Sequence, residues 1–173
     1  LFELEAALTA ATQINVHALA AKFFFFKNTL VLGRGYTFPV ALEAALKFKE
    51  TCKMHAEAFS WAEVMHGPFA LLKKDFPLLI FGPSDRAVCG LDELLAKLQN
   101  LNTQSFVMMA KDKVTTGIKS KASLLLELPQ SLHPLYDPLV AIQAFYLMVE
   151  QCAHLRGIDP DNPDNISKVT DTL

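Results

Sequence analysis

Cysteine is scarce in this sequence, and the few cysteines are widely spaced. Cys52, Cys89 and Cys152 are the three cysteines among 173 residues, and no two of them form a CxxC pair. An odd number of separated cysteines argues against a disulfide framework and against a structural zinc site. The pattern is compatible with a reducing compartment, so we expect a cytoplasmic protein.

The sequence also lacks a large excess of charge and a long apolar run. Its formal net charge is -2 at pH 7, which argues against nucleic acid or an anionic membrane as a partner. The longest apolar cluster, 23–26, lies between Lys22 and Lys27 and is far too short to cross a bilayer. The N-terminus has no signal-peptide pattern. Its first residue is Leu1 rather than Met, which leaves open that the chain is a fragment.

Hydrophobic residues, by contrast, are abundant. They make up 51% of the chain, whereas charged residues make up 20%. A chain of this length fits one domain with a substantial core. The high apolar share also indicates an interface with a subunit or another domain. No internal repeat or low-complexity linker divides the sequence, so we expect residues 1–173 to form a single domain.

Short apolar runs alternate with longer helical stretches along the chain. The runs predict buried strands at 29–32, 77–81, 105–110 and 124–128. Helices are predicted at 2–25, 39–53, 92–101 and 138–156. Such alternation favours right-handed crossovers and a parallel sheet, so the predicted fold is a three-layer α/β domain. The tail, 157–173, contains the run Asp-Pro-Asp-Asn-Pro-Asp and is expected to be extended.

A glycine-containing turn follows the first predicted strand. Ligands of open α/β sheets gather at the carboxyl ends of the strands, and Gly33-Arg34-Gly35 stands at such a place. The next residues, Tyr36 and Thr37, make a poor phosphate cradle compared with glycine and small hydroxyl residues. The turn is therefore interpreted either as part of a ligand site or as a tight strand-to-helix connection.

The helix predicted at 39–53 carries a carboxylate near an ammonium group. Lys47 and Glu50 are three residues apart and so lie on one helical face. Such a pair is suited to moving a proton on carbon next to a carbonyl, because the carboxylate takes the proton and the cation stabilises the enediolate oxygen. The alternative is that the pair, together with Glu43 and Lys49, forms an ordinary solvated face.

Two histidines follow within the next sixteen residues. His55 and His66, with Glu57, have the residue types of a metal site, and His-x-Glu occurs in zinc-dependent deaminases. No Pro-Cys-x-x-Cys follows, so we expect no metal. His66 stands before Gly67-Pro68, where an imidazole at the start of a turn can act as an acid or base near neutral pH. A loop histidine held by hydrogen bonds is the alternative.

Together these segments resemble a known family. The segments 32–35, 41–50 and 55–58, followed by Glu63 and 66–68, resemble the second SIS (sugar isomerase) domain of the glutamine–fructose-6-phosphate aminotransferases in order and spacing. The end of the chain is similar to the closing segment of that family. The resemblance implies a flavodoxin-like αβα domain. It also implies the C-terminal half of a tandem SIS enzyme that acts as a homodimer without a metal or an organic cofactor.

The resemblance implies catalytic roles for four residues. Glu50 matches the carboxylate that moves a proton between C1 and C2 of the open-chain sugar, and Lys47 matches the lysine that assists it. His66 matches the histidine implicated in sugar-ring opening, which in the family reaches the active site of the neighbouring subunit. Lys168 matches the C-terminal lysine that can form a Schiff base with the ketose, a role for which an amine on a tail is chemically suited.

Two further residues, Arg34 and Ser167, are expected to bind the substrate. The SIS domains that hold the sugar phosphate carry a loop of the form Ser-x-Ser-Gly-x-Thr after the second main strand. This chain has Phe-Gly-Pro-Ser-Asp-Arg at that place, 81–86. The departure implies that the phosphate is bound by a preceding SIS domain of the same polypeptide.

The last residues favour one branch of the family. The chain ends in Lys-Val-Thr-Asp-Thr-Leu, which is closer to the glutaminase-free relatives than to the Lys-Ser-Val-Thr-Val-Glu ending of the aminotransferases. We therefore expect an isomerising deaminase that interconverts glucosamine 6-phosphate with fructose 6-phosphate and ammonia. The alternatives are the isomerase half of the aminotransferase, a non-catalytic sugar-phosphate-binding SIS module, and a degenerate SIS half kept for dimerisation.

Overall fold

The chain folds around one parallel β-sheet. The structure, a computed structural model, describes residues 2–162 and 165. Five strands lie in the order β2-β1-β3-β4-β5, and every neighbouring pair is parallel. This is the flavodoxin-like strand order, so the predicted fold class is confirmed. The strands are β1 (Asn28–Gly33), β2 (His55–Ser60), β3 (Pro77–Phe81), β4 (Gln104–Ala110) and β5 (Leu124–Leu128).

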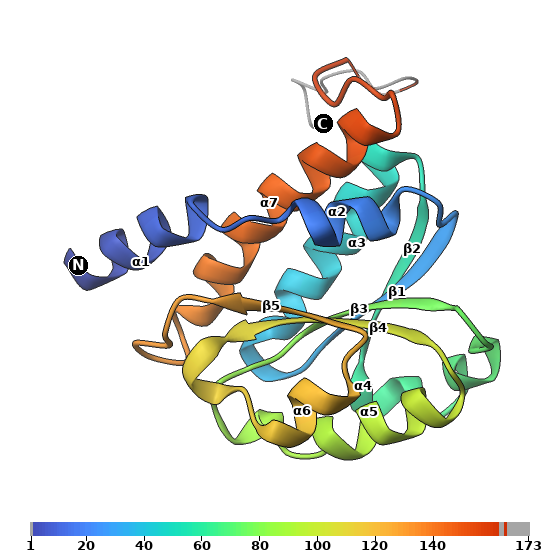
Figure 1. Cartoon of the computed structure of the whole chain (residues 1–173), viewed down its shortest axis with the longest axis horizontal. Coiled ribbons are helices and arrows are strands. Elements are labelled where there is room, and N and C mark those ends of the chain that lie inside the picture. The colour runs from blue at the N-terminus through green and yellow to red at the C-terminus, as the bar shows by residue number, and fades with distance from the viewer. Residues whose placement is uncertain (1, 163–164, 166–173) are drawn as a thin grey trace, which may run out of the picture.

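Helices cover both faces of the sheet and give the domain three layers (Figure 1). One face is covered by α1 (Phe2–Thr12), α2 (His17–Phe23), α3 (Phe38–Cys52) and α7 (Asp137–Leu155). The other is covered by α4 (Trp61–Val64), α5 (Leu91–Asn100) and α6 (Thr116–Lys121). Single 3-10 turns lie at η1 (Gly35–Thr37), η2 (Pro68–Leu71), η3 (Arg86–Val88) and η4 (Lys111–Lys113). Both α3 and α7 begin at the carboxyl edge of the sheet and run back to its amino edge.

The central strands are buried on both faces, as their apolar runs predict. In β4, Phe106 and Met108 face the layer of α2, α3 and α7, whereas Val107 and Met109 face the layer of α5. This division follows from the two-residue period of a strand. A strand of a parallel sheet has helices on both sides, so both sets of side chains must be apolar.

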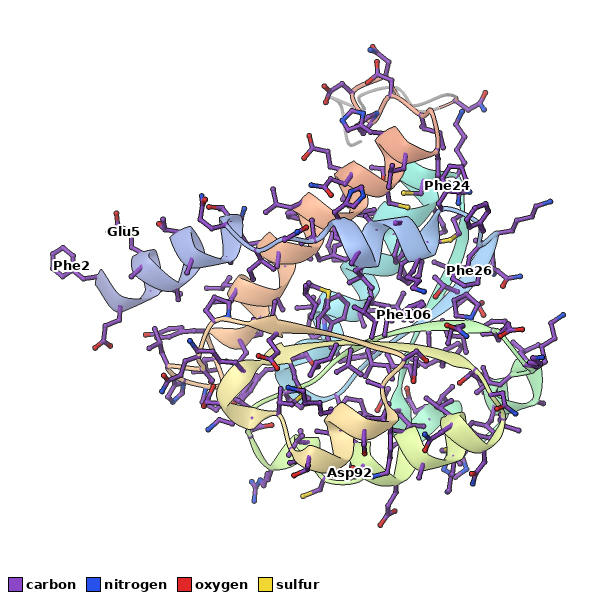
Figure 2. All side chains as sticks on the ribbon, viewed as in Figure 1. Phe2, Glu5, Phe24, Phe26, Asp92 and Phe106 are labelled. Atoms are coloured by element: carbon purple, nitrogen blue, oxygen red, sulfur yellow. The ribbon has the colours of Figure 1, made fainter. Side chains whose placement is uncertain are left out.

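Phenylalanine rings fill the layer between the sheet and the helices of the first face. The ring centroid of Phe23 lies 5.0 Å from that of Phe48 and 5.2 Å from that of Phe106. Phe145 of α7 lies 5.3 Å from Phe48 of α3, and Figure 2 shows Phe106 between the sheet and the helices. All four side chains are fully buried, which is worth about 1.5–3 kcal/mol each. This packing holds α3 and α7 side by side.

The edge strand β2 was not among the predicted strands. Its segment, 55–60, was considered as a source of metal ligands, yet it pairs with the whole of β1, from Asn28 opposite His55 to Gly33 opposite Ser60. In this edge strand Ala56 alone is fully buried, so it lacks the apolar run that predicts the central strands. The short helix α6, between β4 and β5, was also not predicted.

The prediction of a single helix over 2–25 is wrong. The chain forms α1 and α2 with a break at 13–16. The side chain of Asn15 accepts a hydrogen bond from the backbone N–H of His17 at 3.0 Å, which is an Asx turn that competes with helix formation. The break allows Ala11 of α1 and Phe23 of α2 to be buried against the same core.

The end of α2 is held by an arginine from the far end of the chain. Nη1 of Arg156 donates to the carbonyl oxygens of Phe23, Phe24 and Phe26 at 3.1, 2.9 and 2.9 Å. These carbonyls lie at and beyond the end of α2, where regular helical partners are missing, although the carbonyl of Phe23 also accepts the backbone N–H of Phe26 at 3.3 Å. The guanidinium therefore joins the chain after α7 to the connection that leads into β1.

We expect Arg156→Met to lower the free energy of unfolding by about 2–4 kcal/mol, because part-buried carbonyl groups would lose charged donors. Urea denaturation of the full chain measures the change. Arg86→Met is the matched control, since Arg86 is exposed on η3 and its replacement should change the value by less than about 0.5 kcal/mol. Equal values for the two variants would show that the Arg156 hydrogen bonds do not stabilise the fold.

The described chain after α7 contains no further helix or strand. Residues 157–162 form turns and irregular backbone, and the positions 163–164 and 166–173 lie outside the described residues, including Ser167 and Lys168. No helix in the described part of the chain is long and apolar enough to cross a membrane.

Candidate active site

The ion pair predicted from the spacing of Lys47 and Glu50 is present on α3. Nζ of Lys47 lies 2.6 Å from Oε2 of Glu50 and 3.7 Å from Oε1 of Glu43. Roughly a third of each of the three side chains is exposed. The pair therefore lies at the surface of the domain, where a substrate or another chain can reach it.

A fourth residue, Tyr146 of α7, completes the cluster. Its hydroxyl donates to Oε1 of Glu43 at 3.0 Å. Glu43 thus stands between a phenol on one helix and an ammonium group on the other, and it links α7 to the Lys47–Glu50 pair. Desolvation and the hydrogen bond to Glu43 raise the pKa of Tyr146 above its ordinary value.

Lys47 is held firmly in its charged form. The hydrogen bond to Glu50 raises the pKa of Lys47 above its ordinary value, desolvation opposes this, and the charges of Glu50 and Glu43 add to the increase. Lys47 is therefore a donor and a fixed positive charge at neutral pH rather than a base.

We expect Glu50→Gln to lower the pKa of Lys47, and Glu43→Gln to lower it less because Glu43 is the more distant carboxylate. A pH titration of the Lys47 side chain by NMR measures both changes. The control is Glu127→Gln on β5, the strand at the other end of the strand order from β2. It should leave the pKa of Lys47 unchanged. A larger decrease for Glu43→Gln than for Glu50→Gln would contradict the geometry.

The same shift predicts how the pair affects stability. The pKa of Lys47 is raised on folding, so the pair stabilises the fold below about pH 10, the ordinary lysine range. This stabilisation is lost as the pH rises through the folded-state pKa. The effect is small, about 0.3–0.5 kcal/mol, because exposed helical pairs are screened by water. The helix α3 thus holds the two side chains close together, but the pair is not a main source of stability.

The face around this cluster is apolar. Leu42 and Leu46 of α3 are 51% and 41% exposed, and Leu139 and Tyr146 of α7 are 45% and 40% exposed. Neighbouring exposed apolar residues of this kind are typical of a surface that contacts another protein surface. The charged cluster therefore lies in a face that is suited to contact with another protein surface.

His66 lies at the opposite edge of the sheet from Glu50. Glu50 is in the last turn of α3, just before β2 begins at the amino edge of the sheet. His66 is exposed and follows α4, beyond the carboxyl end of β2. The six residues of β2 separate the two positions by roughly 17 Å at the usual rise per residue. The structure does not bring these two predicted residues together within one chain.

Arg34 also lies at the carboxyl edge. It precedes η1, where its backbone N–H donates to the hydroxyl of Thr37 at 3.2 Å. Its side chain lines an open cleft of about 150 Å³ with Trp61, Gly90 and Lys97. The predicted residues therefore divide into two groups, with Lys47 and Glu50 on α3 and Arg34 nearer to His66.

The helix α7, which precedes the C-terminal tail in the sequence, ends near the end of α3. The thiol of Cys52, at the end of α3, contacts the carbonyl oxygen of Val149 in α7 at 3.5 Å. Both helices thus end together at the amino edge (Figure 1). Ser167 and Lys168 themselves lie outside the described residues, so their predicted contacts with the substrate remain predictions.

The described residues contain no group of three His, Cys, Asp or Glu side chains placed to hold a metal ion. His55 and Glu57 are exposed on β2. The α3 cluster itself consists of two carboxylates, an ammonium group and a phenol.

The contribution of Tyr146 and the bridging position of Glu43 were not predicted. Glu43 was considered only as part of a solvated face, and the two residues are 103 positions apart in the sequence. The available signal was the polar residue Tyr146 within an otherwise apolar helix, which indicates a hydrogen-bond partner for its hydroxyl. The partner itself depends on the packing of α7 against α3.

Comparison with protein families identifies the family of the chain. The sequence profile of the SIS domain matches residues 25–155, which is most of the described domain. The chain belongs to the SIS domain family, whose members include phosphosugar isomerases.

Individual proteins that are similar to this chain are named as aminotransferases and phosphosugar isomerases. The chain is 35% identical over 160 residues to glutamine–fructose-6-phosphate aminotransferase (isomerizing) from Mycolicibacterium paratuberculosis, an alignment that covers 91% of this chain and 26% of the relative. It is similar to the C-terminal domain of glucosamine-fructose-6-phosphate aminotransferase from Francisella tularensis, with a TM-score of 0.81, 26% identity, and coverage of 91% and 44% of the two chains. A protein from Silicibacter pomeroyi DSS-3 assigned as a phosphosugar isomerase is 40% identical, with a TM-score of 0.75 and coverage of 90% and 45%. The chain spans about a quarter of the length of the curated relatives it matches.

Proposed function

We propose that this chain is the C-terminal half of a tandem phosphosugar isomerase that interconverts glucosamine 6-phosphate with fructose 6-phosphate and ammonia. The observation that carries the proposal is the Lys47–Glu50 pair, 2.6 Å apart on the accessible face of α3. An isomerisation needs one base that can move a proton between neighbouring carbons and one fixed cation beside the oxygen that becomes negative. The pair supplies both.

In the proposed reaction, Glu50 removes the proton from C2 of the open-chain amino sugar. The electron pair forms an enolamine whose C1 oxygen is stabilised by Lys47, and Glu50 returns the proton to C1. The product is an imine at C2, which water hydrolyses to the ketose with loss of ammonia. The reverse sequence consumes ammonia and forms the amino sugar.

The setting of the pair supports a composite site. Glu50 lies away from the carboxyl edge where a parallel sheet usually binds its ligands, and exposed apolar residues of α3 and α7 surround it. We propose that a preceding SIS domain of the same polypeptide covers this face and holds the sugar phosphate. In a homodimer, His66 would then serve the site of the neighbouring subunit.

An alternative function is the isomerase half of a glutamine-dependent aminotransferase. It is favoured by the 35% identity to the Mycolicibacterium paratuberculosis aminotransferase. The same Lys47–Glu50 pair would perform the proton transfer, with ammonia supplied from glutamine by a further domain. The two alternatives therefore differ in the source of ammonia and in the direction of the reaction rather than in the role of α3.

The test is to incubate the full parent polypeptide with glucosamine 6-phosphate and to follow fructose 6-phosphate and ammonia by NMR. Turnover without glutamine supports the deaminase. If the folded dimer forms glucosamine 6-phosphate from fructose 6-phosphate only when glutamine is present, the aminotransferase alternative is correct. No conversion in either direction would contradict both.

A further inference from the structure

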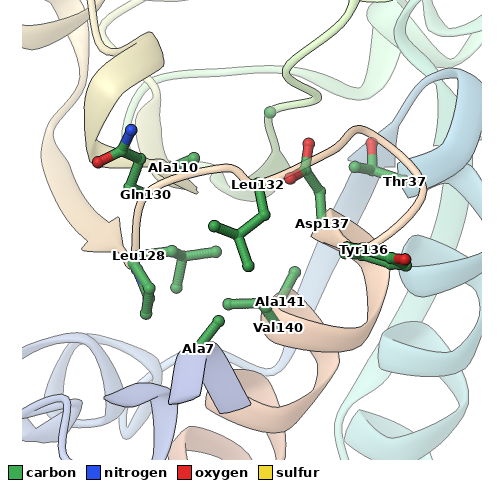
Figure 3. A pocket seen from close by; sticks show the side chains of 12 residues that line it. Ala7, Thr37, Ala110, Leu128, Gln130, Leu132, Tyr136, Asp137, Val140 and Ala141 are labelled. Atoms are coloured by element: carbon green, nitrogen blue, oxygen red, sulfur yellow. The ribbon is translucent and has the colours of Figure 1, made fainter. Parts of the chain in front are cut away.

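A second polar cluster lies at the carboxyl edge of the sheet, far from Glu50. Asp137 is the first residue of α7, and Figure 3 shows its side chain on the wall of the pocket at this edge. Its Oδ2 accepts the backbone N–H of Ser84 at 3.2 Å. Its Oδ1 accepts the hydroxyl of Ser131 at 2.7 Å, and the hydroxyls of Ser84 and Ser131 are hydrogen-bonded to each other at 2.9 Å.

These bonds tie together three loops that follow neighbouring strands. Ser84 follows β3, Ser131 follows β5, and the backbone N–H of Ser131 donates to Oδ1 of Asp112, which follows β4, at 2.8 Å. Desolvation raises the pKa of Asp112, but hydrogen bonds from Ser131 and Lys113 outweigh it and keep this pKa below its ordinary value. The loop positions are therefore fixed by carboxylates of the chain itself.

A further hydroxyl that lines this pocket is also hydrogen-bonded within the chain. The hydroxyl of Thr37, at the end of η1, donates to the carbonyl oxygen of Phe81 at 2.8 Å. Ala7 of α1 closes the pocket from the other side (Figure 3). The volume of the pocket is about 10 Å³, which is room for roughly one water molecule. A sugar phosphate does not fit there.

The arrangement around Asp137 is that of a bound anion. A backbone N–H, a serine hydroxyl and the amino end of a long helix converge on one negative group, and each of these is a favourable partner for a phosphate oxygen. The position is also the edge of the sheet at which ligands of parallel α/β domains bind. In this structure the negative group is the carboxylate of Asp137, a residue of the chain itself.

We propose that the Asp137 carboxylate is a built-in substitute for a bound anion, which holds the loop after β3 in place and closes the pocket beyond the ends of β3, β4 and β5 to sugar phosphates. The inference concerns the opposite edge from Glu50 and does not rest on the proposed reaction. It implies that any phosphate bound by the complete enzyme lies outside this pocket.

The test compares the full chain with Asp137→Ala in chloride and in inorganic phosphate at equal ionic strength. The melting temperature of Asp137→Ala in chloride should fall by about 3–10 °C, because charged hydrogen bonds are lost. Inorganic phosphate should raise it again by several degrees. Phosphate stabilises most proteins slightly through exclusion from their surface, so the readout is the increase in the variant minus the increase in the wild type.

Two further variants keep the test decisive. Asp137→Asn retains the shape of the side chain but loses its charge, so it should melt below the wild type without being rescued by phosphate. Asp75→Asn, an exposed aspartate at the amino edge, is the control and should behave as the wild type. Wild-type melting of Asp137→Asn, or an equal phosphate effect on Asp137→Ala and the wild type, would overturn the proposal. If Asp137→Ala folds only in phosphate, the proposal is supported.

Discussion

Glu50→Gln should lower the turnover of the parent enzyme by about 10²–10⁴-fold, the usual contribution of a positioned general base. The amide cannot take the proton from C2, although it has the size of the carboxylate and can still accept a hydrogen bond from Lys47. Because the pair is partly exposed and contributes little to stability, the variant should fold as the wild type does. Steady-state kinetics with glucosamine 6-phosphate measure the loss.

The control for this prediction is Glu127→Gln, which removes an exposed carboxylate from β5 at the far edge of the sheet. It should leave turnover unchanged within about twofold. The melting temperature and the dimer content of both variants must match the wild type for the comparison to hold. Near-normal turnover in folded Glu50→Gln would remove Glu50 from the mechanism.

Mixing two inactive variants should restore activity if His66 serves the neighbouring subunit. Glu50→Gln and His66→Ala, each nearly inactive alone, would form mixed dimers in which one site has both intact residues. Random exchange makes half of the dimers mixed, with one active site in two, so about one quarter of wild-type turnover is expected for a symmetric dimer. The structure motivates this prediction because β2 separates the two residues within one chain.

Differently tagged variants allow the mixed dimer to be isolated and measured directly. Half of wild-type turnover per mixed dimer would support the shared site. If purified mixed dimers are as inactive as the parents, the two residues act in the same chain. A His66→Ala protein that is fully active by itself would exclude any catalytic role for His66.

The strands buried on both faces could be predicted from the sequence, because their environment demands continuous apolar residues. This holds for β1, β3 and β4, whose residues are almost all buried. The strand β2 was missed because only Ala56 of its six residues is fully buried, so its sequence has no continuous apolar run. In the N-terminal region, Ala and Leu favour helix on both sides of Asn15. The turn at Asn15 was therefore not predicted.

The candidate site, like the fold, could be predicted from the sequence only in part. The approach of Lys47 to Glu50 was predictable because three residues along a helix return the chain to the same face. The link from Glu43 to Tyr146 depends on how α7 packs against α3, and that packing is set by buried rings such as Phe48 and Phe145. No local pattern reports a contact across 103 residues.

Local chemistry therefore decided the buried strands, most of the longer helices and the Lys47–Glu50 ion pair, since each depends on residues close together in the sequence. Tertiary packing alone decided which edge of the sheet each residue occupies. It placed Glu50 and His66 at opposite edges, and it brought Asp137 to Ser84 across 53 positions. The physical reason is that the burial of the two hydrophobic layers orients whole elements, and polar side chains at their ends then meet partners that no local rule specifies.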